Sequence, residues 1–208
     1  MRVLACALVC CYGVAPASAN DTAELADAAA RLQYAFYTND ARGLEQTLAS
    51  LERLAAPAAP PGLKDYYLAF GRWKLARLTL GAEPSSGAAR TRAAKQAQAC
   101  RERAQASAER AAHPAEAYAL LAACSEMTQS LRLPSLWRDS AAGCLRSKAW
   151  RRAHDLAPDN PRVLLVAALC VHERSAPGDA PALERLREVV RAFEAAGPAR
   201  VGPGEPDW

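Results

Sequence analysis

The stretch AWRRAHDLAPDNP, residues 149–161, decides the fold class of this 208-residue chain. Small residues and one leucine carry a helix up to Pro158, which ends it because proline cannot continue the i to i−4 hydrogen-bond ladder. Asp159 or Asn160 can then cap a second helix, and Pro161 suits its first turn. The stretch therefore predicts two consecutive helices joined by a tight turn.

The composition of the whole chain favours helices. Alanine makes up about a quarter of the residues, and alanine has the highest intrinsic helix propensity. Runs of the β-branched residues that are typical of strands are missing. Hydrophobic residues account for 51% of the chain, so the composition is not that of a disordered protein.

Clusters of proline and glycine divide the chain into helices. They lie at residues 57–62, 81–87, 113–114, 133–135, 158–161 and 176–179. The segments between them, with a further break at residues 38–40 in the first, predict eight helices. These are expected over residues 22–37, 41–55, 63–80, 88–112, 115–131, 135–156, 161–173 and 180–196.

Four segments share a spacing in which a large residue is followed, three positions later, by another apolar residue and then directly by a small one. They are Tyr67-Phe70-Gly71, Tyr118-Leu121-Ala122, Leu164-Ala167-Ala168 and, more weakly, Leu25-Ala28-Ala29. This spacing, together with the junction at 149–161, resembles the tetratricopeptide repeat (TPR). In that family the small residue lets the partner helix approach closely.

The resemblance implies an all-α fold: a TPR-like α-solenoid, a right-handed stack of about four antiparallel helix pairs. The predicted repeat domain covers residues 20–196, and a Gly/Pro-rich tail follows at 197–208. Tyr67 and Tyr118 are 51 positions apart, compared with about 34 in the family pattern. The chain is therefore interpreted as an elongated relative.

A cleavable signal peptide is predicted over residues 1–19. Arg2 supplies the positive start, the apolar run after it is too short to span a bilayer, and Ala17-Ser18-Ala19 offers a small-x-small cleavage pattern. Cleavage before Asn20 implies an exported protein of a bacterial-type periplasm, with no transmembrane segment in the mature chain. Two alternatives stay open: a buried N-terminal strand or helix, and a lipoprotein, which the large residue before Cys10 disfavours.

Four cysteines remain once the signal peptide is removed, and an even number in an exported protein suggests disulfides. In an antiparallel helix pair, residues equidistant from the turn lie level with each other. Cys100 and Cys124 lie about 12 positions on either side of residue 112, and Cys144 and Cys170 lie about 13 positions on either side of the next turn. The pairs Cys100–Cys124 and Cys144–Cys170 are therefore predicted. The alternative is four buried thiols.

No motif for catalysis or cofactor binding stands out. The three histidines are isolated in sequence, and no nucleophile elbow, P-loop or dinucleotide fingerprint occurs. No Cys/His spacing typical of a zinc site and no Cys-x-x-Cys motif is present. We therefore expect a protein that is not an enzyme, with no cofactor and no metal.

An aromatic stripe at helical spacing is the strongest candidate for a binding surface. Tyr66, Phe70 and Trp73 share one face, Arg77 extends it, and Lys74 is expected to point elsewhere. Such a stripe is more often core, but the TPR resemblance places first helices along an inner, concave groove. The residues predicted to bind a partner there are Tyr66, Trp73, Arg77, Glu116 and Met127.

These features predict a non-catalytic protein–protein interaction scaffold of the cell envelope, which binds a peptide or helix of another envelope protein. The formal net charge is +4, and basic residues cluster within helices 88–112 and 135–156. These clusters are interpreted as solvated faces or as contacts with an anionic membrane surface, and a nucleic-acid partner is not expected. Two alternative functions stay open: an envelope assembly factor at such a surface, and an enzyme or small-molecule binder with an unrecognised pocket.

Overall fold

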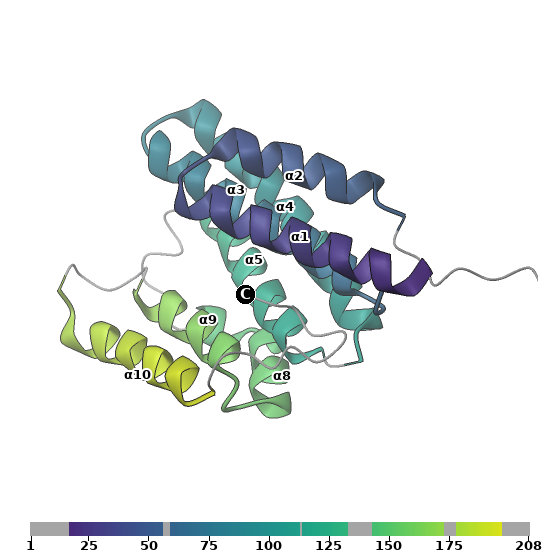
Figure 1. Ribbon diagram of the computed structural model, residues 1–208. Coiled ribbons are helices and arrows are strands. Elements are labelled where there is room, and N and C mark those ends of the chain that lie inside the picture. Colours follow the sequence, from purple (N-terminus) through teal and green to yellow (C-terminus); the bar gives the residue numbers. More distant parts are fainter. Residues whose placement is uncertain (1–16, 56–58, 113, 133–142, 173–177, 197–208) are drawn as a thin grey trace, which may run out of the picture.

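The computed structural model describes residues 17–55, 59–112, 114–132, 143–172 and 178–196, and these residues form helices and the short segments that connect them, without a strand. The predicted all-α class is therefore confirmed for this part of the chain (Figure 1). The helices are α1 (Ala17–Tyr37), α2 (Ala41–Arg53), α3 (Leu63–Ala82), α4 (Gly87–Arg110), α5 (Ala115–Arg132), α7 (Gly143–Arg146), α8 (Lys148–Leu156), α9 (Pro161–His172) and α10 (Ala180–Ala196). Most of the predicted signal peptide and the whole predicted tail lie outside the described residues. Within the described part, no helix combines the length and apolar character needed to cross a bilayer.

The helices pack as successive pairs. Helix α1 contacts α2, α3 contacts α4, α5 contacts α8, and α9 contacts α10. Each pair is joined to the next through contacts of α1 with α3, α3 with α5, and α5 with α9. Figure 1 shows α1–α5 together in the upper part of the molecule and α8–α10 below them. The first helices of consecutive pairs therefore lie side by side.

Helix α3 is the centre of the larger hydrophobic core. It buries side chains around its whole circumference, among them Tyr66, Tyr67, Leu68, Phe70, Trp73 and Leu75. Residues at consecutive positions point to different sides of a helix, so this pattern requires neighbours on every side. Helices α1, α2, α4 and α5 supply them. A helix that is apolar all round can be stable in water only when it is enclosed in this way.

Helix α4 approaches α3 through a stripe of small side chains, and this is the most extensive helix–helix contact in the described part. The stripe recurs every three or four residues, which places it on one face of the helix. It consists of Ala89, Ala93, Ala97, Cys100, Ala104 and Ala108, all of them buried. Because no side chain in the stripe is large, the two helix axes can come close along six turns of α4.

A buried carboxylate joins the start of α3 to the end of α4. Asp65 is 6% exposed and forms ion pairs with Arg103, at 2.9 Å, and with Arg110. Gly62, the residue before α3, has a φ of +84°, and a Cβ there would lie 2.8 Å from the carbonyl oxygen of Ser107. Only glycine combines this left-handed conformation with so close an approach to another backbone.

Side-chain caps set most of the helix starts. Asp40 accepts a hydrogen bond from the Gly43 amide at 2.8 Å, and Ser86 accepts one from the Ala89 amide at 3.2 Å. The predicted junction at 149–161 is confirmed, since α8 ends at Leu156, α9 begins at Pro161, and Asn160 Oδ1 accepts from the Arg162 amide at 2.9 Å.

The single helix predicted over 135–156 is wrong in its described part. The chain forms α7 and α8, separated at Ser147, whose backbone is extended with ψ of 144°. The Ser147 hydroxyl accepts a hydrogen bond from the Trp150 amide at 3.0 Å and so begins a new helix. A serine side chain can cap a new helix, and this competes with continuing the existing one. At Ser147 the cap is favoured. Residues 133–142 of the predicted helix lie outside the described part.

Both predicted cysteine pairs lie at disulfide distance. The Cα atoms of Cys100 and Cys124 are 5.7 Å apart, and those of Cys144 and Cys170 are 6.1 Å apart, within the range that a disulfide spans. Cys100–Cys124 joins α4 to α5, and Cys144–Cys170 joins α7 to α9. Each bridge therefore ties one helix pair to the first helix of the next.

Gly71 of α3 lies where both α1 and α2 pack against this helix. A Cβ on Gly71 would lie 2.8 Å from a methyl carbon of Leu48 and 2.9 Å from a methyl carbon of Leu32. Gly81, in the last turn of α3, has no atom within 4 Å of the same position. The small residue at position 71 is thus a packing requirement, whereas the one at position 81 is not.

Removing either disulfide should lower stability, because each bridge closes a loop with a sequence separation of 24 or 26 residues. Loop-closure entropy in the unfolded chain gives a loss of about 3 kcal/mol for each double variant, Cys100→Ala/Cys124→Ala and Cys144→Ala/Cys170→Ala. Urea unfolding followed by circular dichroism measures it. Reductant should destabilise the wild type but leave a variant without both bridges unchanged. Non-reducing peptide maps that join other cysteines would contradict the assignment.

Replacing Gly71 by valine should destabilise the protein by about 1–3 kcal/mol, because the new side chain overpacks the contact with Leu32 and Leu48. The matched variant Gly81→Val should change the free energy of unfolding by less than about 0.5 kcal/mol, since that position faces open space. Urea midpoints of the two variants, measured side by side, test this packing. Equal losses would show that helix propensity and not close packing sets the effect.

Candidate partner-binding surface

A buried lysine surrounded by aromatic rings is the most unusual feature of the described residues. Lys74, in the middle of α3, is 8% exposed. Its Nζ lies 3.7 Å from the centre of the Phe36 ring, 4.9 Å from that of Phe70, 5.1 Å from that of Trp73 and 5.7 Å from that of Tyr37. All four distances are within the range at which a ring face attracts a cation.

The local sequence explains half of this arrangement. Phe70, Trp73, Lys74 and Arg77 lie at i, i+3, i+4 and i+7 of α3, so they share one side of the helix. The Arg77 guanidinium extends the group, with its central carbon 5.1 Å from the centre of the Trp73 ring. The last turn of α1 supplies the remaining two rings. We call Phe36, Tyr37, Phe70, Trp73, Lys74 and Arg77 the Lys74 cluster.

The electrostatics of the Lys74 cluster disfavour its central charge. Burial and, to a smaller extent, the positive charge of Arg77 together lower the pKa of Lys74 from 10.5 to about 8. Within the described part, no carboxylate forms an ion pair with Lys74; the contacts of its ammonium group are the ring faces. The ring faces attract the cation, but they do not replace the water that burial removes.

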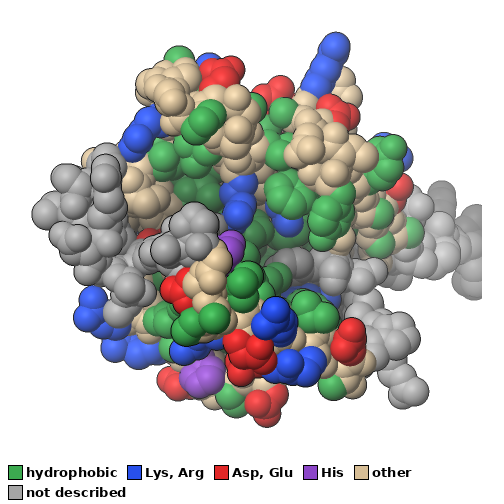
Figure 2. All heavy atoms as spheres, turned by 90° about the vertical axis from the view of Figure 1, so that its left-hand side faces the viewer, with side chains coloured by type: hydrophobic (Ala, Val, Ile, Leu, Met, Phe, Trp, Pro, Cys, Tyr) green, Lys and Arg blue, Asp and Glu red, His purple; other side chains and the backbone are tan. Residues whose placement is uncertain are grey.

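The last two turns of α1 carry two exposed aromatic side chains, one of which belongs to the Lys74 cluster. Tyr37 is 74% exposed although its ring lies near Lys74, and Tyr34, one turn earlier in α1, is 73% exposed. The end of the molecule at which α1 and α9 finish faces the viewer in Figure 2. There, hydrophobic side chains surround a hollow that contains Lys or Arg side chains (Figure 2). Aromatic rings and cations thus meet at the surface on this side.

The structure places the five predicted binding residues in different environments. Tyr66 is 1% exposed and packs edge-on against Tyr67 in the core, which corrects its interpretation as a residue that contacts a partner. Met127 packs partly buried against the same core. Trp73 and Arg77 are neighbours in the Lys74 cluster. They remain the members of the predicted set that lie next to exposed aromatic surface.

Glu116, the fifth predicted residue, is bound by side chains at the start of α9. Its Oε1 accepts hydrogen bonds from Arg162 at 2.8 Å and from Asn160 at 3.0 Å, and both charged side chains are mostly buried. Glu116, Arg162 and Trp73 line the same small cavity between α3, α5 and α9, and its other lining residues are apolar. The carboxylate therefore fastens α5 to the start of α9 through Oε1, while its Oε2 is buried without a hydrogen bond to any described residue.

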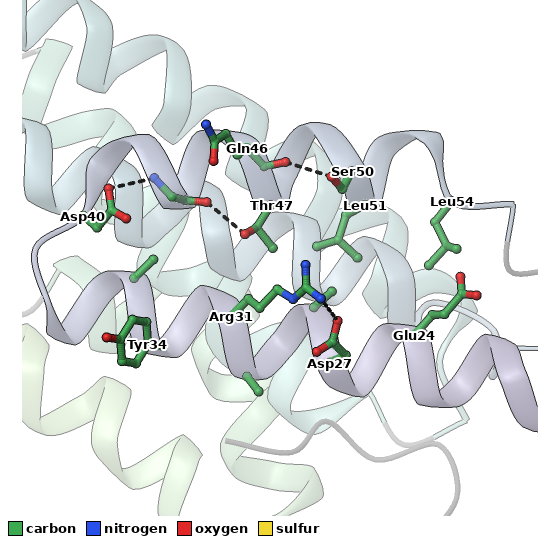
Figure 3. Close-up of a pocket in the computed structure, with 14 residues that line it drawn as sticks. Glu24, Asp27, Arg31, Tyr34, Asp40, Gln46, Thr47, Ser50, Leu51 and Leu54 are labelled. Carbon is green, nitrogen blue, oxygen red and sulfur yellow. Dashed lines mark hydrogen bonds and ion pairs between the residues drawn. The ribbon is translucent and has the colours of Figure 1, made fainter.

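A groove of about 720 Å³ runs between α1 and α2 (Figure 3). Its polar side chains are occupied within their own helices: the Thr47 hydroxyl donates to the Gly43 carbonyl at 2.9 Å, and the Ser50 hydroxyl donates to the Gln46 carbonyl at 3.1 Å. Arg31 pairs with Asp27 at 2.7 Å. Tyr34 lines this groove. The groove is large, but its polar groups do not converge on one point.

Other chemistry is sparse in the described part. Among these residues, no group of three or more His, Cys, Asp or Glu side chains is arranged to hold a metal ion. The basic residues of α7 and α8, namely Arg146, Lys148, Arg151 and Arg152, are exposed. Their charge is therefore open to solvent on a different element from the Lys74 cluster.

Sequence reasoning missed Lys74, which was expected to point away from the aromatic stripe. The structure corrects this, because the lysine curls over the rings of Phe70 and Trp73. A lysine in the run at residues 66–76, whose only other charged residue is Arg72, is a usable signal, since burial there leaves a charge to be accounted for. The rings of α1 could not be assigned in this way, as they come from a different helix.

Comparison with known proteins adds no relative. The chain matches no family model, no curated protein and no solved structure. The resemblance to the tetratricopeptide repeat therefore rests on the residues quoted above.

The free energy of unfolding should depend on pH through Lys74. The pKa of this lysine is lower in the folded state than in the unfolded chain, so the unfolded chain holds more protons between pH 8 and 10.5. Stability therefore rises with pH over that interval. Between pH 7 and pH 10 the wild type should gain about 2 kcal/mol relative to Lys74→Met. Urea unfolding of both proteins measures this, and parallel pH profiles would contradict it.

Proposed function

We propose that this protein is a non-catalytic interaction scaffold that binds a peptide or helix of another envelope protein on the face formed by its first helices, α1, α3, α5 and α9. Contacts between consecutive members of this series support the proposal, because they create one continuous face. The assignment to the envelope rests on the predicted signal peptide and is compatible with two cysteine pairs at disulfide distance.

We further infer that the helix pairs form a TPR-like α-solenoid. The small residues at the quoted spacing support this arrangement, since Ala29, Gly71, Ala122 and Ala168 are all buried. Gly71 lies where two helices of the preceding pair approach, which is the role that the resemblance implies for a small residue. Disulfides between consecutive pairs would hold such a stack in one curvature.

The observation that carries the proposed function is the exposed Tyr37 beside the buried Lys74. Tyrosine, tryptophan and arginine are enriched among residues that dominate binding energy, because they bury a large area and still offer a polar group. Tyr37, Trp73 and Arg77 belong to one cluster, and Tyr37 leaves most of its ring in solvent. A partner that covers Tyr37 would remove this apolar area from water.

Two tyrosines of α1 allow a sharp test. A photo-crosslinking amino acid at position 37 should join the protein to a defined envelope protein, whereas the same group at exposed Arg187 of α10 should not. For the partner so identified, Tyr37→Ala should weaken binding about tenfold, or about 1.4 kcal/mol, as measured by calorimetry.

The matched control is Tyr34→Ala, which removes an equally exposed ring that lines the α1–α2 groove. This variant should bind the partner as the wild type does. If Tyr34→Ala weakens binding and Tyr37→Ala does not, the α1–α2 groove is the binding surface and the proposed location is wrong. Equal crosslinking at positions 37 and 187 would argue against a specific partner.

A further inference from the structure

Burying the ammonium group of Lys74 among aromatic rings costs free energy. An ammonium group has three N–H donors, and ring faces satisfy them poorly compared with water or a carboxylate. The other buried charges of the described part are paired: Asp65 lies between two arginines, and Glu116 lies against Arg162. Lys74 differs from them because the groups around it are aromatic rings and a second cation, Arg77.

The position of Lys74 makes this difference relevant to binding. It lies in the middle of α3, one of the first helices, and its ammonium group is near the ring of Tyr37, which reaches solvent. Positive charge therefore collects where the proposed function places the partner. Charge complementarity favours a partner segment that carries negative charge.

We propose that Lys74 recognises a carboxylate of the bound segment, so that the partner is an acidic peptide or helix whose glutamate or aspartate side chain pairs with Lys74 at the Tyr37 edge of the Lys74 cluster. This inference rests on the proposed function, because it names the chemistry of the same surface. The carboxylate would supply acceptors for the N–H donors of Lys74. The ring of Tyr37 would cover the resulting pair and exclude water from it.

A carboxylate suits this site better than a phosphate group. A phosphate carries up to two charges and several acceptor oxygens, and proteins usually hold it with many donors at once. Here four aromatic rings surround one buried ammonium group. A narrow side chain with a single negative charge therefore fits this site better than a phosphate group. A flexible glutamate can approach past Tyr37 while the backbone of the partner stays on the surface.

Matched synthetic peptides test the inference. An array of 15-residue peptides is built in pairs that differ only by glutamate in one member and glutamine in the other, and is probed with the purified protein. Glutamate members should bind about tenfold more tightly than their glutamine partners. The Lys74→Met variant should lose this preference, whereas the exposed-lysine control Lys148→Met should keep it.

The outcomes separate this inference from the proposed function. If glutamate and glutamine members bind equally and both lose affinity with Tyr37→Ala, the surface is a binding site but the carboxylate preference is wrong. If the Lys74→Met variant still prefers glutamate peptides, the inference is also overturned, because another residue then binds the carboxylate. If no peptide binds, the proposed function itself fails, and this inference fails with it.

A second variant guards against loss of the fold. Lys74→Arg keeps the positive charge among the rings and should retain a preference for glutamate members, even if reduced. Circular dichroism and thermal melts of both variants show whether the helices remain. A folded Lys74→Arg protein with no preference for glutamate would contradict the assignment of the carboxylate to this position.

Discussion

The close packing of α4 against α3 is the contact on which the rest of the structure depends. Most side chains of α3 from Leu63 to Ala76 are buried, so its stability requires neighbours that cover them. The alanine stripe of α4 allows this because small side chains let two helix axes approach along their whole length. Van der Waals contacts are individually weak, and a long, close interface gathers many of them.

Several other features follow from this enclosure. With α4 close to α3, the carboxylate of Asp65 comes within reach of Arg103 and Arg110, and Gly62 can place its backbone against the end of α4. The same face of α4 carries Cys100, so the stripe that packs against the core also presents a thiol to α5. Packing, ion pairing and the disulfide therefore reinforce one arrangement of the helices.

Enclosure also leaves buried charges in two kinds of surroundings. Asp65 and Glu116 are buried, and arginines neutralise both. Lys74 is also buried, but rings and a second cation surround it; burial, and to a smaller extent the charge of Arg77, lower its pKa. A folded protein tolerates such a charge at a cost of a few kcal/mol when the rest of the core is well packed. Residues of this kind are where a binding function is best sought.

The amino-acid sequence by itself determined the local features of this protein. Caps and breakers mark where helices begin and end, because Asn160, Pro158 and similar residues act within one turn of their own position. The pairing of the cysteines was predictable for a related reason: two thiols equidistant from a turn lie level once the helices fold back on each other. Only the tertiary structure decided which side of a helix meets which neighbour. It buried Tyr66 and brought the rings of α1 over Lys74, since these outcomes depend on side chains that are distant in sequence and compete for the same space.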